Sequence, residues 1–113
     1  MAGKFELKKS KNGKFMFNLR AGNNQVILTS ETYNDKDGAQ GGIESVRNNA
    51  NDDARYERRN STKNEPYFVL KAINGEIIGT SEMYSSASAM ENGIASVKAN
   101  SPAASVVDTT ANG

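Results

Sequence analysis

The chain has 113 residues and a mass of 12.2 kDa, which is enough for one domain and too little for two. It contains no cysteine, histidine or tryptophan, which excludes disulfide scaffolds, Cys/His zinc sites and catalytic groups built on a thiolate or an imidazole. The formal net charge of +1 gives no overall attraction to a polyanion.

The first predicted element is a β-hairpin. Phe5 and Leu7 alternate with charged residues, Asn12-Gly13 supplies a turn, and apolar residues alternate again over residues 15–21. A strand rich in β-branched residues, 26–31, follows the turn at residues 22–24.

An amphipathic helix is predicted next. Ala39, Ile43, Val46 and Ala50 have the spacing of one helix face. Either Asn34 or Asp35 can cap its N-terminus. The polar segment 49–52 ends the helix, and a short closing strand is expected over residues 55–58.

The second half of the chain follows the same order. A turn at residues 73–75 leads into a strand over 77–82, and a helix carries Ala87, Met90, Ile94 and Val97 on one face. Ser85 or Ser86 can cap this helix, and the Pro102 region ends it. We expect a closing strand over 105–108 and a frayed tail over 109–113.

This likeness is an internal duplication. When residues 17–58 are placed on residues 68–109 without a gap, 14 of 42 positions are identical. The sequence predicts an α+β protein in which two tandem β-β-(β)-α-β repeats form one antiparallel sheet of six to eight strands with two helices on one face. We expect a single domain, 1–113, with repeat one at 1–59, a polar connector at 60–65 and repeat two at 66–110. The piece at residues 5–8 is expected only in the first repeat.

Two motifs resemble those of a known family. Thr-Ser-Glu-x-Tyr occurs at 29–33 and 80–84, and Gly-Ile-x-Ser-Val at 42–46 and 93–97. Together they resemble the YegP-like family of uncharacterised small bacterial proteins, over essentially the whole chain. The first repeat departs in having Thr32 for Met83 and Asn34-Asp35 for Ser85-Ser86. The resemblance implies that the closing strands 55–58 and 105–108 pair with the opposite repeat, and it implies no activity.

The residues shared by the repeats are the first candidates for a site. Within the aligned segments, Glu31 and Glu82 are the only acidic pair that is identical. They could form an acid/base pair or bind a divalent cation. A structural role is the favoured alternative, either at a helix N-terminus or in ion pairs with Arg20 and Lys71.

Other shared residues carry weaker suggestions of chemistry. Ser30 and Ser81 have no histidine to activate them, so hydroxyls satisfied by backbone are expected. Gly38 and Gly41 have the Gly-x-x-Gly spacing of a nucleotide clamp, within a predicted helix. Gly42 and Gly93 suggest a close approach of helix to sheet. We expect a mainly structural role for all the repeat-shared residues: Thr29, Ser30, Glu31, Tyr33, Gly42, Thr80, Ser81, Glu82, Tyr84 and Gly93.

Charge is shared unevenly between the halves, with +3 up to Arg59 and −2 after it. A possible binding surface is the first hairpin, where a basic cluster accompanies Phe5 and Phe15: Lys4, Lys8, Lys9, Lys11 and Lys14. Lysines beside aromatics can follow a single nucleic-acid strand. The alternative, which we favour, is that these lysines protect an exposed edge strand from pairing.

These features favour a non-catalytic interaction module with an unknown partner, for which a protein is one candidate. Weak nucleic-acid binding through the Lys4–Lys14 hairpin and a metal or acid/base site at Glu31/Glu82 are the alternatives. No cofactor is expected. No apolar run approaches the roughly 18 residues of a membrane span, and no signal peptide is evident, so we expect a cytoplasmic protein without membrane contact. Two copies in one chain predict a monomer with internal pseudo-two-fold symmetry.

Overall fold

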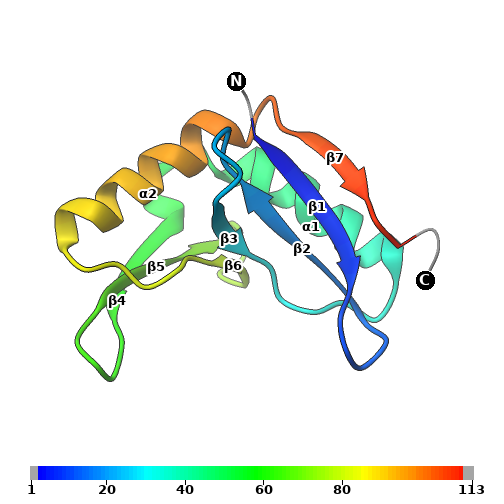
Figure 1. The fold of residues 1–113 in the computed structure, drawn as a ribbon, viewed down its shortest axis with the longest axis horizontal. Helices are drawn as coiled ribbons and strands as arrows, with labels where there is room; N and C mark the ends of the chain where they lie inside the picture. The colour runs from blue at the N-terminus through cyan, green and yellow to red at the C-terminus, as the bar shows by residue number, and fades with distance from the viewer. Residues whose placement is uncertain (1–2, 111–113) are drawn as a thin grey trace.

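The computed structural model describes residues 3–110 as one seven-stranded sheet with two long helices (Figure 1). The strand order is β4-β5-β6-β3-β2-β1-β7. The elements, in chain order, are β1 (Lys4–Lys9), β2 (Phe15–Arg20), β3 (Val26–Thr29), α1 (Lys36–Asn49), a 3-10 turn (Asp53–Arg55), β4 (Tyr56–Asn60), β5 (Pro66–Lys71), β6 (Ile77–Thr80), α2 (Ala87–Asn100) and β7 (Ser105–Asp108). The α+β architecture built from two tandem repeats is confirmed.

The first hairpin has a counterpart on the other side of the sheet, contrary to our expectation, in which β4, from the end of the first repeat, takes the place of β1. β4 pairs with β5 as β1 pairs with β2, and the rings of Phe5 and Tyr56 meet Phe17 and Phe68 edge-to-face at 5.8 and 5.6 Å. The segment predicted as a connector is therefore the turn of this hairpin. The counterpart was missed because the two strands retain little identity: Glu6 and Glu57 are identical, but Phe5 and Tyr56 share only aromatic character.

Both helices begin where capping residues were predicted. The Asp35 side chain accepts a hydrogen bond from the Gly38 N–H at 2.7 Å, and Ser86 accepts one from the Ala89 N–H at 3.1 Å. Each side chain satisfies an amide that the first helical turn leaves without a backbone partner. The helices are therefore capped by Asp35 and Ser86, and not by the alternative candidates Asn34 and Ser85.

The strand that follows each helix pairs with the other repeat, as the family resemblance implied. β4 follows α1 and pairs with β5, whereas β7 follows α2 and pairs with β1. The sheet is mixed rather than wholly antiparallel, because β7 runs parallel to β1. The predicted fraying is wrong at Thr109, whose N–H donates to the Leu7 carbonyl at 2.9 Å; residues 111–113 lie outside the described part of the chain.

The two repeats share one core. The largest fully buried side chains come from both of them: Phe5, Phe17, Leu19 and Leu28 from the first, and Phe68, Val69 and Leu70 from the second. Each helix also contacts strands of both repeats, α1 lying against β2 and β6 and α2 against β5 and β3. The repeat boundaries 1–59 and 66–110 stay a prediction. Among the described residues, no helix has the length and apolar character needed to cross a membrane.

The pseudo-two-fold axis passes between β3 and β6. These strands meet at one antiparallel pair, Thr29 opposite Thr80, and the two threonines are equivalent in the repeats. Beside them the symmetry is broken, because Leu28 is equivalent to Gly79. A Cβ on Gly79 would lie 2.6 Å from Leu28 Cγ. The Leu28 side chain therefore fills the space at the axis, and the equivalent residue, Gly79, has no side chain there.

Candidate functional site

Two grooves lie where one repeat meets the other. The Glu82 groove has a volume of about 400 Å³ and lies between the β2–β3 turn and the start of α2. The Glu31 groove, of about 510 Å³, is lined by Glu31, Tyr33 and the residues 75–78 around the β5–β6 turn. The internal symmetry relates the two grooves, since each combines a Glu-x-Tyr segment of one repeat with a turn of the other.

The Glu82 groove gathers residues that the repeats share. Seven of the eleven residues that line it are identical in the other repeat, compared with a third of positions over the duplication as a whole. Those seven are Ala21, Asn23, Ile27, Glu82, Tyr84, Gly93 and Ser96. A groove at this position is therefore a feature of the repeated unit.

Each groove has a tyrosine that packs against a helical glycine. The Tyr84 ring stacks on Phe68 and the Tyr33 ring on Phe17, both with centroids 6.4 Å apart. A side chain on Gly93 would overlap the Tyr84 hydroxyl, and one on Gly42 would overlap that of Tyr33. The mid-helix glycines thus make room for the tyrosines that form the groove walls.

Glu31 and Glu82 do not share a site. β3 and β6 run antiparallel from the Thr29–Thr80 pair, so the chain carries Glu31 and Glu82 away from that pair in opposite directions. Each carboxylate lines a different groove. The hypothesis of one acid/base or metal-binding pair formed by both residues is therefore not supported by their placement.

The ion pairs predicted for these two glutamates are wrong. Arg20 Nε lies 3.0 Å from Glu6 Oε1, and Lys71 pairs with Glu57. These partners face one another across neighbouring strands of each hairpin. Within residues 3–110, neither Glu31 nor Glu82 has an ion-pair partner within 4.0 Å, and both residues are exposed. Among residues 3–110, no ion pair or side-chain hydrogen bond of these two carboxylates explains why they are identical in the repeats.

Other shared polar residues have internal partners. Ser30 Oγ accepts from the Phe17 N–H at 2.8 Å and donates to the Glu31 carbonyl, and Ser81 makes the same contacts with Phe68 and Glu82. The Asn23 side chain accepts from the Gln25 N–H at 3.1 Å, as Asn74 does from Glu76 at 3.0 Å. These hydrogen bonds hold the strand ends and turns that form the grooves.

Burial and the nearby glutamates raise the pKa of each groove tyrosine. Burial raises the pKa of the Tyr84 phenol, and the negative charge of Glu82 raises it further. Burial likewise raises the pKa of Tyr33, and here both Glu31 and Glu76 add to the increase. Both phenols are therefore protonated at neutral pH, and each groove is an acidic environment around a neutral aromatic ring.

The basic hairpin is not at the edge of the sheet. β7 pairs with Lys4–Leu7 of β1, so this part of the strand is not an exposed edge for the lysines to protect. Lys8 pairs with Glu6 at 3.4 Å, and the Lys9 ammonium lies 5.7 Å from the centre of the Phe15 ring. Lys11 and Lys14 are exposed in the turn. Nucleic-acid binding by this hairpin stays a prediction. Gly38 and Gly41 lie within α1, which leaves no clamp loop.

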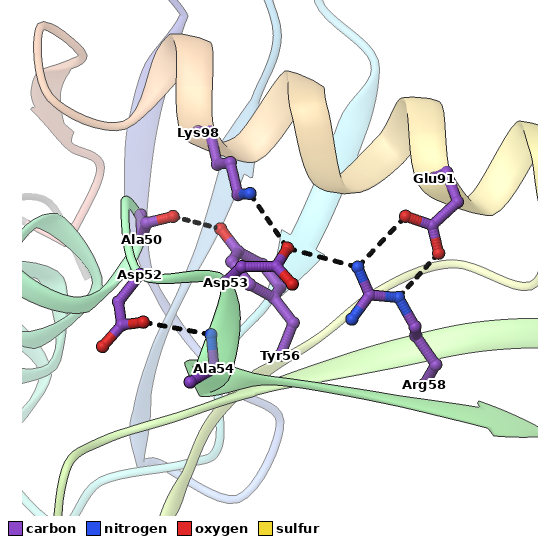
Figure 2. A network of polar contacts seen from close by, with 8 residues as sticks. All are labelled: Ala50, Asp52, Asp53, Ala54, Tyr56, Arg58, Glu91 and Lys98. Atoms are coloured by element: carbon purple, nitrogen blue, oxygen red, sulfur yellow. Dashed lines mark hydrogen bonds and ion pairs between the residues drawn. The ribbon is translucent and has the colours of Figure 1, made fainter.

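An ionic network elsewhere fastens β4 to α2 (Figure 2). Arg58 binds both carboxylate oxygens of Glu91, at 2.6 and 3.1 Å, and Asp53 accepts from Arg58 at 3.2 Å and from Lys98 at 3.0 Å. The hydrogen bond from Lys98 is the main cause that lowers the pKa of Asp53. Since each charge has a partner, this network holds β4 against α2. No local pattern announces it, because its members lie up to 45 residues apart.

The sequence interpretation missed one pair of groove residues, Gln25 and Glu76. They occupy equivalent positions in the two turns and line the two grooves. The sequence did contain a signal, because Gln25 and Glu76 are one of the few equivalent pairs at the grooves that differ between the repeats. Its meaning depends on the contact of each turn with the Glu-x-Tyr segment of the other repeat, which is a long-range feature.

Comparison with known proteins places both repeats in one family. Residues 10–57 and 61–108 each match the family described as "Domain of unknown function (DUF1508)". The chain is 51% identical to the UPF0339 protein YegP of Yersinia pestis over 96% of both chains, and 54% identical to a UPF0339 protein of Bordetella pertussis over 97% of this chain and 98% of that one.

Two solution NMR structures share the fold. The E. coli protein of unknown function yegP superposes with a TM-score of 0.93 and 50% identity, over 98% of this chain and 96% of that chain. A UPF0339 protein of Shewanella oneidensis superposes with a TM-score of 0.91 and 52% identity, over 97% and 93%.

Proposed function

Since the chain belongs to the DUF1508 family, the YegP-like proteins of unknown function, we propose that it is a non-catalytic binding module whose two grooves each take a positively charged group. The observation that carries this proposal is the placement of Glu82. This glutamate is identical in both repeats, lines the Glu82 groove and has no ion-pair partner within the described residues. The proposal includes a monomer that acts in the cytoplasm.

The chemistry of the groove indicates an ammonium or guanidinium group on a short apolar stem. Glu82 supplies the opposite charge, and the Tyr84 ring offers an aromatic surface for a cation. Val26 and Ile27 line the same groove and can contact the stem. Because the site is open to solvent, one such ion pair contributes little, and we expect weak binding with a dissociation constant well above a millimolar.

A titration of ¹⁵N-labelled protein at low salt tests this proposal. The probe is n-butylammonium, and n-butanol and butyrate are the neutral and anionic controls of similar size. We expect butylammonium to shift the amides of residues 24–26 and 82–84, while the two controls do not. Raising the ionic strength should weaken the effect, because salt screens exposed charges.

The variants E82Q and E65Q separate a site from general attraction. E82Q should abolish the shifts in the Glu82 groove and leave those around Glu31 in place. Glu65 is exposed in the β4–β5 turn and lines neither groove, so E65Q should change nothing. Equal responses to butylammonium and butanol, or an unchanged response in E82Q, would refute the proposed function.

A further inference from the structure

The two grooves share an aromatic and an apolar lining residue and differ in charge. Tyr33 and Ile78 in the Glu31 groove are equivalent to Tyr84 and Ile27 in the Glu82 groove. At the turn, however, the Glu31 groove has Glu76 where the Glu82 groove has Gln25. The formal charge is therefore −2 in the Glu31 groove and −1 in the Glu82 groove, which residues of α2 also line.

Glu76 is held at the groove by its own turn. Its N–H donates to the Asn74 side chain at 3.0 Å, and its Oε1 accepts from the Asn74 amide at 3.0 Å. Gln25 is held in the same way by Asn23, with distances of 3.1 and 3.4 Å. Both side chains thus have the same support, so exchanging Glu and Gln alters the charge with little effect on the turn.

No basic residue offsets the two carboxylates. Among the described residues, neither Glu31 nor Glu76 has a Lys or Arg nitrogen within 4.0 Å. The charges that act on the neighbouring Tyr33 phenol are those of Glu31 and Glu76, both negative. Ile77 and Ile78 supply an apolar wall beside them.

We infer that Glu76 and Gln25 determine specificity, so that the Glu31 groove selects a ligand with two ammonium groups on an aliphatic stem and the Glu82 groove a ligand with one. This inference rests on the proposed function. A second carboxylate gives the second ammonium group an opposite charge in the Glu31 groove, whereas the Gln25 amide carries no charge to match it. The shared chemistry is that of an alkyl diamine or of two lysine side chains on a peptide.

The test compares 1,4-diaminobutane with 1-aminobutane on the same labelled protein. The amides of Gly75, Glu76 and Ile77 report on the Glu31 groove, and those of Asn24, Gln25 and Val26 on the Glu82 groove. The two ends of the diamine give it a statistical advantage of a factor of two in either groove. In the Glu31 groove we expect the diamine to bind about a further threefold more tightly than the monoamine. In the Glu82 groove only that statistical factor should remain.

Two single variants exchange the determinant. E76Q should reduce the diamine preference of the Glu31 groove to the statistical factor, and Q25E should create the preference in the Glu82 groove. Each variant introduces the residue that the other repeat already has, so both should fold. A blocked peptide with two adjacent lysines, titrated in parallel, distinguishes a peptide source of the ammonium groups from a free diamine by which of the two binds more tightly.

The outcomes separate the inference from the proposed function. If neither amine shifts residues of either groove, the proposed function fails. If both grooves bind amines but show the same diamine preference, or if E76Q and Q25E leave the preferences unchanged, the proposed function stands and the specificity inference is overturned.

Discussion

The Tyr84 hydroxyl occupies the space that a side chain on Gly93 would need, and Tyr33 has the same relationship with Gly42. This contact accounts for two of the most recognisable shared pairs in the sequence. Each tyrosine lies between a core phenylalanine and a helix backbone. The helix can therefore approach the strand end closely enough to form one wall of the groove.

Substituting Gly93 by alanine should destabilise the protein. The added methyl group would overlap the Tyr84 hydroxyl, and forced overpacking costs more than the helix propensity that alanine gains. We expect a net loss of about 1–2 kcal/mol in the free energy of unfolding, measured with urea. G41A is the matched control, because nothing lies within 4 Å of its added methyl group; it should be neutral or slightly stabilising. Equal stability of G93A and G41A would contradict the packing described.

The asymmetric pair at the pseudo-two-fold axis gives a second test. G79L should be strongly destabilised, by about 3 kcal/mol or more, since two leucines would compete for one space. The double variant L28G/G79L places the single leucine on the other repeat and should recover much of that loss. Urea unfolding of the two variants provides the comparison. A double variant no more stable than G79L alone would show that the space beside the axis is not shared.

Ser101 is a buried residue with an unsatisfied hydroxyl. Its side chain is fully buried, and its Oγ has no hydrogen-bond partner within the described residues. The equivalent residue in the first repeat is Ala50, also fully buried. S101A should therefore raise the free energy of unfolding by about 1 kcal/mol, and the converse change A50S should lower it by a similar amount. Destabilisation by S101A in thermal or urea unfolding would indicate that the hydroxyl has a partner.

Acid should loosen the edge strand β7. The hydrogen bond from Lys36, with further ones from Thr110, lowers the pKa of Asp108 from 3.8 to about 2. A carboxyl group whose pKa is lower in the folded state stabilises that state above its unfolded pKa, and the contribution disappears as the pH falls through the folded value. The contribution of this ion pair should be complete above about pH 4.5 and lost between about pH 4 and 2.

Hydrogen exchange of the Thr109 amide measures this effect, because that amide donates to Leu7 across the β1–β7 pair. Its protection should fall with pH over this range, after correction for the intrinsic exchange rate. D108N should show reduced protection already at pH 6 and little further pH dependence. A Thr109 amide that responds to pH equally in D108N and in the unsubstituted protein would exclude the Lys36–Asp108 pair as the cause.

Features governed by neighbours in sequence could be predicted, and features governed by distant contacts could not. The Asn12-Gly13 turn, the two helices and the Asp35 and Ser86 caps follow from local chemistry. The parallel pairing of β7 with β1 joins residues about a hundred positions apart, and the sequence pattern of a short strand does not reveal the direction of its neighbour.

The candidate site divides in the same way. Glu31, Tyr33 and Gly42 were recognised because both repeats contain them, but their grooves arise only when the turn of the other repeat is added. The pairing of Arg20 with Glu6 illustrates the limit, since charge and strand spacing alone allowed Glu31 as the partner. The internal duplication identified the shared residues as candidates. The three-dimensional contacts were needed to separate the shared residues that have hydrogen-bond or ion-pair partners within the chain from those that do not.

The most direct measurement is the urea unfolding free energy of the double variant E31Q/E82Q. The central claim is that these carboxylates are retained for binding and not for folding. We therefore expect a stability within about 0.5 kcal/mol of the unsubstituted protein, as for exposed residues without structural contacts, together with loss of amine binding. A loss of more than about 1 kcal/mol would show that the two glutamates hold the fold together and would contradict the claim.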